Sequence, residues 1–266
     1  AMGRESWAKG TDNISIGHKA ETDSSGDSIA MGRESKANQA NAIAVGPQAD
    51  ANGWGGIAVG REAAVSANFA TAMGYQSQAK GSASVAIGKQ NKSNVGDTIT
   101  MGNSNTANTM GGIAIGKNNT ADSSIGDSTS ATKENSQIAI GLDNKATSVD
   151  TVAIGREAES TKSGAVAMGA RVKAKGDYAV AIGSASQNKT VEAADYAVAV
   201  GAMSKANADR SVAIGGGAET TAGASRSVAH GYKANASVAD GVALGSNSKA
   251  TVDKGVKGHN PAEDRD

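Results

Sequence analysis

A glycine recurs every fourteen residues along most of this chain, and this period limits the possible folds more than any other feature. All steps from Gly32 to Gly116, and from Gly141 to Gly183, have this length. Each glycine closes a short word of small and bulky apolar residues, such as SVAIG at 84–88 and TVAIG at 151–155. A fixed period of this kind is typical of repeat proteins, in which each unit packs against its neighbours. The sequence therefore predicts a solenoid of stacked coils.

After Gly32, three longer steps interrupt the series. The steps that end at Gly201 and Gly231 are longer by four and two residues, and we interpret both insertions as surface loops, the first being KTVEAAD at 189–195. The step from Gly116 to Gly141 is the longest. Residues 117–137 form either a short coil, with SIGDSTSA at 124–131 anchored on Gly126, or one long loop. The sequence leaves both alternatives open. The anchor glycines are Gly3, Gly17, Gly32, Gly46, Gly60, Gly74, Gly88, Gly102, Gly116, Gly141, Gly155, Gly169, Gly183, Gly201, Gly215, Gly231 and Gly245.

The composition indicates thin, regular layers in place of a conventional core. The 266 residues include 35 glycines but only one phenylalanine, two tryptophans and four tyrosines, although aromatic side chains usually dominate cores. Regularly spaced Val and Ile argue against disorder. The 26 basic and 26 acidic residues balance, so nothing indicates a nucleic-acid or anionic-membrane partner. The absence of cysteine excludes disulfides and thiolate metal sites. No apolar run reaches the roughly 18 residues of a membrane helix.

Each coil is expected to hold two strands. Before the anchor glycine, positions −3 and −1 are bulky and position −2 is small, and both faces are apolar, which predicts a strand buried on both sides. After the glycine, positions +3 and +5 are small, as at Ser35 and Ala37, whereas position +4 is mostly polar, as at Lys36. This pattern predicts a second strand with one buried and one solvated face. Like strands stack in parallel from coil to coil.

The period also predicts which side chains fill the coils. Because large side chains pack against small ones across a thin layer, we expect the bulky residues to lie inside each roll, opposite the small +3 and +5 residues. The small residues at −4 and −2 then face a symmetry axis, where copies of the chain cover the remaining apolar face. The predicted repeat core is Ile43, Val45, Ile57, Val59, Val85, Ile87, Ile113, Ile115, Val152, Ile154, Val180 and Ile182. The predicted trimer-facing residues are Ala44, Ala58, Ser84, Ala86, Ala114, Ala153 and Ala181.

Repeated SVAIG words followed by a G-x-x-[S/A]-x-A pattern resemble the YadA-like head domain of trimeric autotransporter adhesins. The resemblance covers nearly the whole chain, from Gly3 to about Ala250. It implies an all-β, left-handed parallel β-roll, a two-stranded solenoid of about fourteen-residue coils that assembles as a homotrimer. The left-handedness comes from the resemblance alone. We expect a head β-roll of about 17 to 18 coils over residues 1–252, and a decayed last coil with a charged tail over residues 253–266.

The resemblance also implies a place and partners. Such heads belong to the bacterial cell surface, anchored in the outer membrane through a C-terminal region that we expect to lie outside this segment, together with the neck and stalk. The implied partners are the chain itself, as a homotrimer, and host extracellular matrix proteins such as collagen, fibronectin or laminin. No cofactor is expected. The leading function is that of a surface adhesin head, and the alternative is a non-adhesive structural spacer that displays another module.

Candidate chemical sites are few. His18 follows Gly17 in a turn and His259 lies in the tail, so both are expected to be solvated. His230 replaces the bulky residue in SVAHG, which indicates either structural tolerance or an ion-binding cluster of symmetry-related copies. The repeated Arg-Glu pairs, as at Arg61 and Glu62, either keep the surface solvated or read a ligand. An acyltransferase-like enzyme ranks well below the adhesin and the spacer, because those β-helices use a six-residue period. We therefore expect no enzymatic activity.

Overall fold

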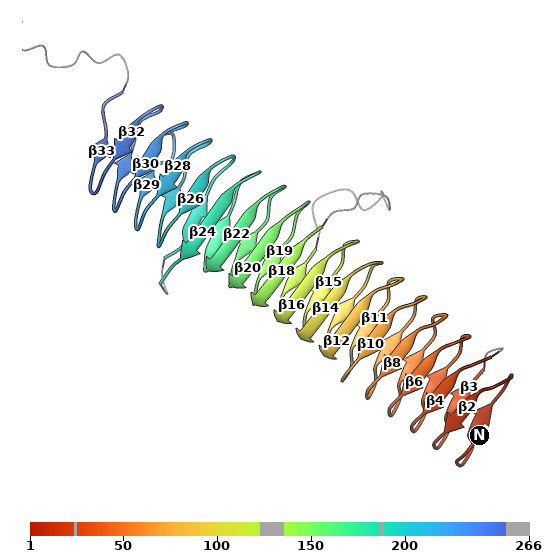
Figure 1. Ribbon diagram of the computed structural model, residues 1–266. Helices are drawn as coiled ribbons and strands as arrows, with labels where there is room; N and C mark the ends of the chain where they lie inside the picture. The colour runs from red at the N-terminus through yellow and green to blue at the C-terminus, as the bar shows by residue number, and fades with distance from the viewer. Residues whose placement is uncertain (24–25, 123–135, 187–188, 254–266) are drawn as a thin grey trace, which may run out of the picture. The chain divides into compact units, whose positions relative to one another are not determined.

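The computed structural model describes residues 1–23, 26–122, 136–186 and 189–253. Every element in this part of the chain is a short β-strand, and the chain divides into two units, 1–157 and 158–266. Each unit is a stack of coils in which even-numbered strands pair with even-numbered strands and odd-numbered strands with odd-numbered strands, always in parallel (Figure 1). The fold of each unit is therefore the predicted parallel β-solenoid with about fourteen residues per turn.

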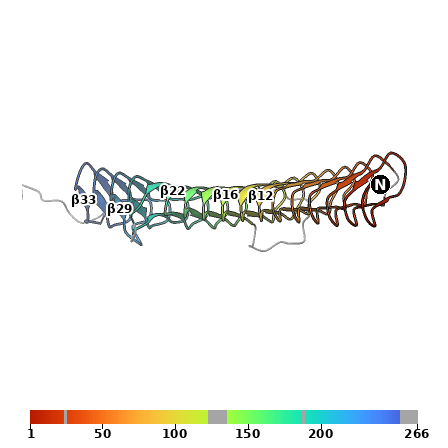
Figure 2. The same ribbon diagram turned by 90° about the horizontal axis from the view of Figure 1, so that it is seen from below.

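In the first unit, each coil places one strand in each of two sheets, which Figure 2 shows as two layers. The even-numbered strands are β2 (Ile14–Ile16), β4 (Ile29–Met31), β6 (Ile43–Val45), β8 (Ile57–Val59), β10 (Thr71–Met73), β12 (Val85–Lys89), β14 (Ile99–Asn103), β16 (Ile113–Lys117), β18 (Ile138–Leu142) and β20 (Val152–Arg156). The odd-numbered strands are β1 (Trp7–Ala8), β3 (Glu21–Thr22), β5 (Lys36–Ala37), β7 (Asp50–Ala51), β9 (Ala64–Val65), β11 (Gln78–Ala79), β13 (Lys92–Ser93), β15 (Thr106–Ala107), β17 (Thr120–Ala121) and β19 (Lys145–Ala146).

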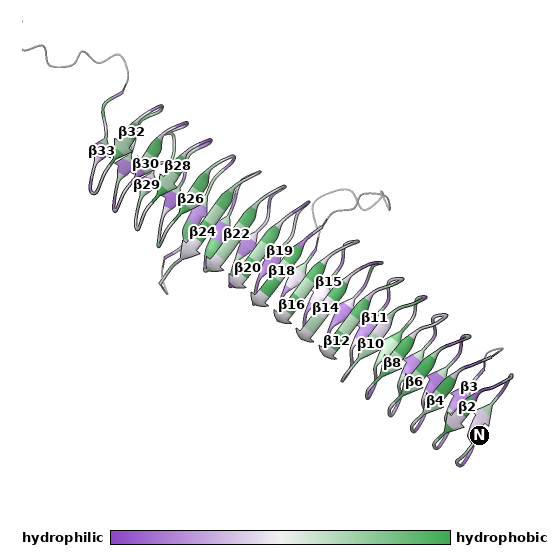
Figure 3. Cartoon of the chain, in the orientation of Figure 1, coloured by the Kyte–Doolittle hydropathy of each residue, from purple (hydrophilic) through white to green (hydrophobic). Residues whose placement is uncertain are grey.

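The second unit repeats this arrangement. Its even-numbered strands are β22 (Val166–Ala170), β24 (Val180–Ser184), β26 (Val198–Val200), β28 (Val212–Ile214), β30 (Val228–His230) and β32 (Val242–Leu244). Its odd-numbered strands are β21 (Glu159–Ser160), β23 (Val172–Ala174), β25 (Val191–Ala193), β27 (Lys205–Ala206), β29 (Glu219–Thr220), β31 (Asn235–Ala236) and β33 (Lys249–Ala250). In both units we call the even-numbered strands the apolar sheet and the odd-numbered strands the polar sheet. In Figure 3 the green, hydrophobic segments lie mainly on the even-numbered strands and the purple, hydrophilic ones on the odd-numbered strands.

The register aligns equivalent positions of successive coils. Ala44 lies beside Ala58 and Ile43 beside Ile57 in the apolar sheet, and Lys36 lies beside Asp50 in the polar sheet. A side chain of one kind at one coil position therefore becomes a column that runs along the unit. Columns of this kind, and not isolated residues, make up the surfaces of the molecule.

The interior of each coil is filled by small side chains from both sheets. Ala44 and Ala58, at position −2 of the apolar sheet, have 0% exposure, and so do Ala37 and Ala51 at position +5 of the polar sheet. Apart from Gln137, the largest fully buried side chains are valines, asparagines and threonines. The prediction that the +3 and +5 residues point into the roll is confirmed, and their polar +4 neighbours lie outside.

The predicted placement of the bulky residues is wrong. Val85 and Ile87 are half-buried in the single chain and lie on the outer face of the apolar sheet, while Ser84 and Ala86 between them have 0% exposure. The twelve residues of the predicted repeat core share the outward placement of Val85, and the seven predicted trimer-facing residues are all fully buried inside the roll. The reason is that small side chains on both inner faces let the two sheets approach closely, which leaves no room for Val or Ile at −3 and −1.

The anchor glycines are required by the stacking of the turns. Gly32 has φ +136°, and a Cβ added to it would lie 2.5 Å from the carbonyl oxygen of Gly46 in the next coil. Any side chain at this position would meet backbone and not a flexible neighbour. The fourteen-residue glycine period is therefore a consequence of coil-to-coil contact at the turn.

Two further turn positions in most coils adopt the left-handed conformation with residues other than glycine. They are position +2, as at Glu34 with φ 59°, and position −5, as at Asn41 with φ 58°. The residues found at these positions include no Val, Ile or Thr. Branching at Cβ is strongly disfavoured at positive φ, so the chain restricts the turns to residues that tolerate this conformation.

The two insertions lie at turns, but the predicted position of the first one is wrong. Val191–Ala193, which we predicted to belong to a loop, forms β25 and pairs with β23 in register. The extra residues of this coil instead precede β25, after β24 ends at Ser184, and they include residues 187–188, which lie outside the described part. Whether 117–137 form a short coil anchored on Gly126 or one long loop is not tested, because most of these residues lie outside the described part. Their flanking strands β16 and β18 pair directly with each other.

Candidate interaction surfaces

The outer face of the apolar sheet is the first candidate surface. In both units, bulky residues from positions −3 and −1 stand side by side along this face. Met31, Met73 and Met101 are 39–41% exposed in the single chain. Large continuous apolar faces on a soluble protein mark association sites. This face is suited to contact with another apolar surface.

The outer face of the polar sheet is the second candidate surface, and in the first unit it carries an open groove of about 920 Å³. Its floor is formed by side chains at position +4 and its wall by side chains at position +2 of the turns. The lining residues are Glu5, Trp7, Lys9, Lys19, Glu21, Glu34, Lys36, Gln48, Asp50 and Glu62. A second groove of about 590 Å³ shares Glu62 and continues along the same two columns to Ser104 and Thr106. We call the two together the outer groove.

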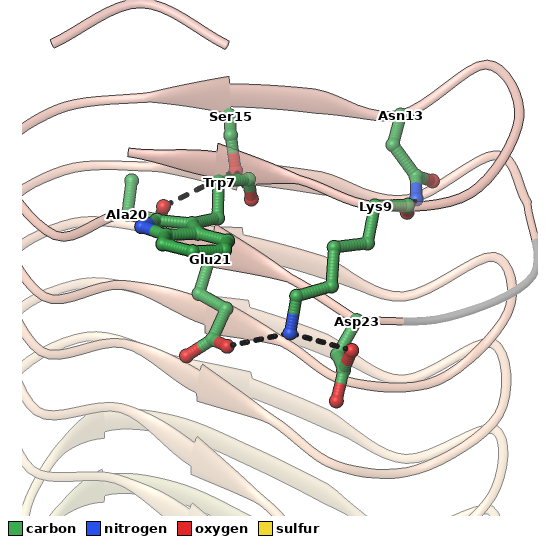
Figure 4. A network of polar contacts seen from close by, with 7 residues as sticks. All are labelled: Trp7, Lys9, Asn13, Ser15, Ala20, Glu21 and Asp23. Atoms are coloured by element: carbon green, nitrogen blue, oxygen red, sulfur yellow. Dashed lines mark hydrogen bonds and ion pairs between the residues drawn. The ribbon is translucent and has the colours of Figure 1, made fainter. Parts of the chain in front are cut away.

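One end of the outer groove is held by a small ionic network (Figure 4). Lys9 Nζ lies 3.1 Å from Asp23 Oδ1 and 3.5 Å from Glu21 Oε1, and it also lies 5.6 Å from the ring centre of Trp7. The hydrogen bond and charge of Asp23 raise the pKa of Lys9. Trp7 remains 60% exposed. This end therefore combines an exposed indole with paired charges.

The wall of the outer groove is a ladder of amides and carboxylates. Gln48 Nε2 donates to Glu34 Oε2 at 2.9 Å, and Gln76 Nε2 donates to Glu62 Oε2 at 2.6 Å. These bonds lower the pKa of each glutamate, and Arg61 adds to the effect at Glu62. The carboxylates therefore stay ionised along the wall, and amides separate them.

Asp50 on the floor of the outer groove is a partly buried carboxylate. Burial raises its pKa, while hydrogen bonding from Asn52 and the charge of Lys36 oppose that shift. Its Oδ1 atom is inaccessible to solvent and has no hydrogen-bond partner among the described residues. A buried carboxylate oxygen without a hydrogen-bond donor is energetically unfavourable, so Asp50 lowers the stability of the folded chain.

A column of buried asparagines begins in the coils of the second groove, continues beyond it, and is not predicted by the sequence analysis. Asn91, Asn105, Asn119 and Asn144 occupy position +3, where most other coils have Ser or Ala, and all have 0% exposure. Each amide from Asn105 onward bonds to Oδ1 of the preceding asparagine at 2.8–3.0 Å. Each also donates to a backbone carbonyl of its own coil and to the glycine carbonyl of the next. The sequence signal was present, as Asn at +3 in successive coils.

The second unit has a stacked column on its rim. The rings of Tyr178 and Tyr196 are 5.5 Å apart and nearly parallel, and the guanidinium of Arg210 lies 5.2 Å from the ring centre of Tyr196. Tyr178 also covers Gly164, where an added Cβ would lie 2.6 Å from the ring. The two rings therefore stack along the rim while remaining 59% and 51% exposed.

The histidines and Arg-Glu pairs lie in different places. The ring of His18 is 2.9 Å from Arg4 Nη2 in a turn of the first unit, and His230 is exposed on the apolar sheet of the second. His259 lies outside the described residues. Arg61 and Glu62 form an exposed ion pair at 2.9 Å, which contributes little to stability. Among the described residues, no group of three or more His, Cys, Asp or Glu side chains could hold a metal ion.

No helix in the described part of the chain has the length and hydropathy to cross a membrane.

Stacked parallel coils with an apolar outer sheet and a polar one define a two-sheet β-solenoid. The family model described as the YadA head domain repeat matches residues 24–49, 40–63, 51–77, 66–91, 138–158, 160–186, 193–218 and 222–248. The chain therefore belongs to the YadA head family, an adhesin-type structural family whose members form surface-exposed parts of trimeric autotransporter adhesins. Among curated proteins, none matches the chain.

Proposed function

We propose that this chain is the head of a bacterial surface adhesin, assembled as a homotrimer, that attaches to host extracellular matrix or cells by contact and without chemistry. The observation that carries the proposal is the division of each coil into two faces. One outer face is apolar and the other polar, grooved and repeated from coil to coil. Three copies that cover their apolar sheets would leave three polar sheets exposed.

The chemistry of the polar sheet supports binding to an extended partner. The outer groove presents the same two columns of side chains in successive coils, and it is open along its length. Weak contacts repeated along the groove and across three chains gain strength by avidity, by about 10²–10⁴-fold. Because 26 basic and 26 acidic residues balance, long-range steering is minor and binding should weaken only modestly with added salt.

The test is saturable binding of the purified chain to immobilised collagen, fibronectin and laminin, compared with a version that lacks residues 39–80. This deletion removes three fourteen-residue coils and joins Asn38 to Gly81 in the same register. A distributed surface predicts a gradual loss of affinity. A complete loss would indicate a discrete site in the deleted coils.

The second candidate function is a non-adhesive spacer that displays another module of a longer surface protein. The observation in its favour is the internal pairing of the groove wall, where Gln48 and Gln76 already satisfy Glu34 and Glu62. A spacer predicts no saturable binding to any of the three matrix proteins. Binding above the background of a denatured sample would exclude it.

A further inference from the structure

His230 interrupts an otherwise apolar column. It is the last residue of β30 and is aligned with Ile214 of β28 and Leu244 of β32. Among the described residues at positions −3 and −1 of the apolar sheet, it is the only one whose charge changes with pH. Its side chain is exposed in the single chain. A titratable ring thus stands on the surface that the proposed trimer would cover, one strand before the last strand of the apolar sheet.

Covering this surface removes water from the ring without supplying a partner from the same strands. Val228, Ile214 and Leu244 have no polar side-chain atoms. Burying a polar group without a hydrogen bond is unfavourable, so an imidazole here needs a partner from another chain. Each of the two partner chains of the proposed homotrimer would bring the same apolar residues and one imidazole to the contact.

A neutral imidazole has one nitrogen that donates and one that accepts. Three copies around a threefold axis can therefore each donate to the next and accept from the previous one, which satisfies every nitrogen. We propose that the three copies of His230 form such a closed ring of neutral imidazoles, and that protonation of the ring opens the trimer. This inference rests on the proposed homotrimer, because the site is incomplete in one chain.

Protonation removes the acceptor nitrogen that closes the ring. A protonated imidazole has two donors and no acceptor, so it cannot accept from its neighbour, and three like charges would face one another in apolar surroundings. The strands that flank His230 offer no carboxylate at the aligned positions. The adjoining turn carries Tyr232 and Lys233, whose ammonium lies 5.1 Å from the tyrosine ring centre. Neither compensates a positive charge, since Lys233 is itself cationic.

The direction of the pH effect follows from proton linkage. Imidazole ordinarily titrates near pH 6.5, and separated chains bind protons that the closed ring excludes. The trimer is therefore fully stable above this range and loses stability as the pH falls through it. Each proton taken up on dissociation changes the equilibrium by at most about tenfold per pH unit, so three protons change it by at most about 1,000-fold per pH unit.

The experiment measures the trimer dissociation constant of the full chain by sedimentation at pH 7.5 and pH 5.5, in buffer with a metal chelator. The wild-type constant should rise by at least about 100-fold at pH 5.5. H230Q keeps a donor and an acceptor but does not titrate, so it should form a trimer with little pH response. H230I, which copies Ile214, should behave in the same way. The double variant H18Q/H259Q removes the other two histidines of the sequence and should keep the wild-type response.

The outcomes separate the ring from the trimer. An equal pH response in H230Q and the wild type, or its loss in H18Q/H259Q, would overturn the ring. A wild-type trimer with the same dissociation constant at both pH values would also overturn it. A folded wild-type monomer at pH 7.5 would contradict the homotrimer on which the proposed function rests, and the ring with it.

Discussion

The side-chain amide of Asn105 donates to Oδ1 of Asn91 at 3.0 Å across one coil, with both residues fully buried. The same nitrogen also donates to the carbonyls of Met101 and Gly116, at 2.9 and 2.8 Å. The backbone nitrogen of Asn105 donates to the same Oδ1 at 3.0 Å. One side chain thus ties three successive coils together. The asparagine column acts as a polar spine inside an interior otherwise filled by small side chains, most of them alanine.

We predict that Asn105→Leu destabilises the first unit by at least about 2 kcal/mol, because it leaves buried carbonyl groups without donors. Leucine also exceeds the space left by alanine-sized neighbours. The check is the free energy of unfolding in denaturant. Asn94→Leu is the matched control, since Asn94 is only part-buried and its side-chain amide donates to Asn108 Oδ1 of the next coil. Equal effects of the two substitutions would contradict a role for the buried spine.

Gly46→Ala should be as damaging as a core substitution. Its φ is +126°, and an added Cβ would lie 2.7 Å from the carbonyl oxygen of Gly60. The left-handed region alone costs roughly 1–2 kcal/mol, and the backbone contact adds to it. Gly216→Ala is the control, because its nearest neighbour is the Tyr232 ring at 3.5 Å. Thermal unfolding should show a clear loss for the first variant and little change for the second.

Replacement of Asp50 should stabilise the protein at neutral pH. Burial raises the pKa of its carboxyl in the folded chain, so the folded state binds the proton more tightly than the unfolded state. Stability from this group is present below the ordinary aspartate pKa and is lost as the pH rises through the raised value. Asp50→Asn should therefore raise the melting temperature at pH 7 and have less effect at pH 3. A larger gain at pH 3 would contradict this sign.

The strand nature of 191–193 can be tested with a pair of charge substitutions. Val191 is fully buried in β25, whereas Lys189, two residues earlier, is exposed. Val191→Asp buries an unpaired charge and should unfold the second unit, while Lys189→Asp should leave it intact. Circular dichroism and limited proteolysis distinguish the two. Tolerance of Val191→Asp would restore the interpretation of 189–195 as a loop.

The sequence predicted the solenoid, its period and the inward +3 and +5 residues, because backbone stacking demands glycine and small residues at fixed places. It did not predict which face of the VAI word points inward. Alternation shows that the strand has two faces but not which of them points into the roll. Ala86 and Val85 are both apolar, so either could be buried there. Only the thinness of the interior decides between them, and that depends on the small residues of both sheets together. The pairing of Asp50 and Lys36 likewise depends on the register between coils.

The outward placement of the bulky residues specifies which side chains would form the trimer contact. In a trimer built on the apolar sheet, the side chains of Ile113 and Ile115 would contact partner copies, while Ala114 would stay inside its own roll. The exposed polar sheet would be free for other partners. Assembly through the apolar sheet and binding through the polar sheet therefore both depend on the outward placement of the bulky residues.

The most direct measurement is the mass of the chain in dilute solution by light scattering, for the wild type and two variants. The account predicts three chains for the wild type and for Lys92→Glu, which alters the polar sheet. It predicts loss of the trimer for Ile115→Asp, which places a charge on the apolar sheet without touching the interior. A folded wild-type monomer, or an Ile115→Asp trimer as stable as the wild type, would contradict it.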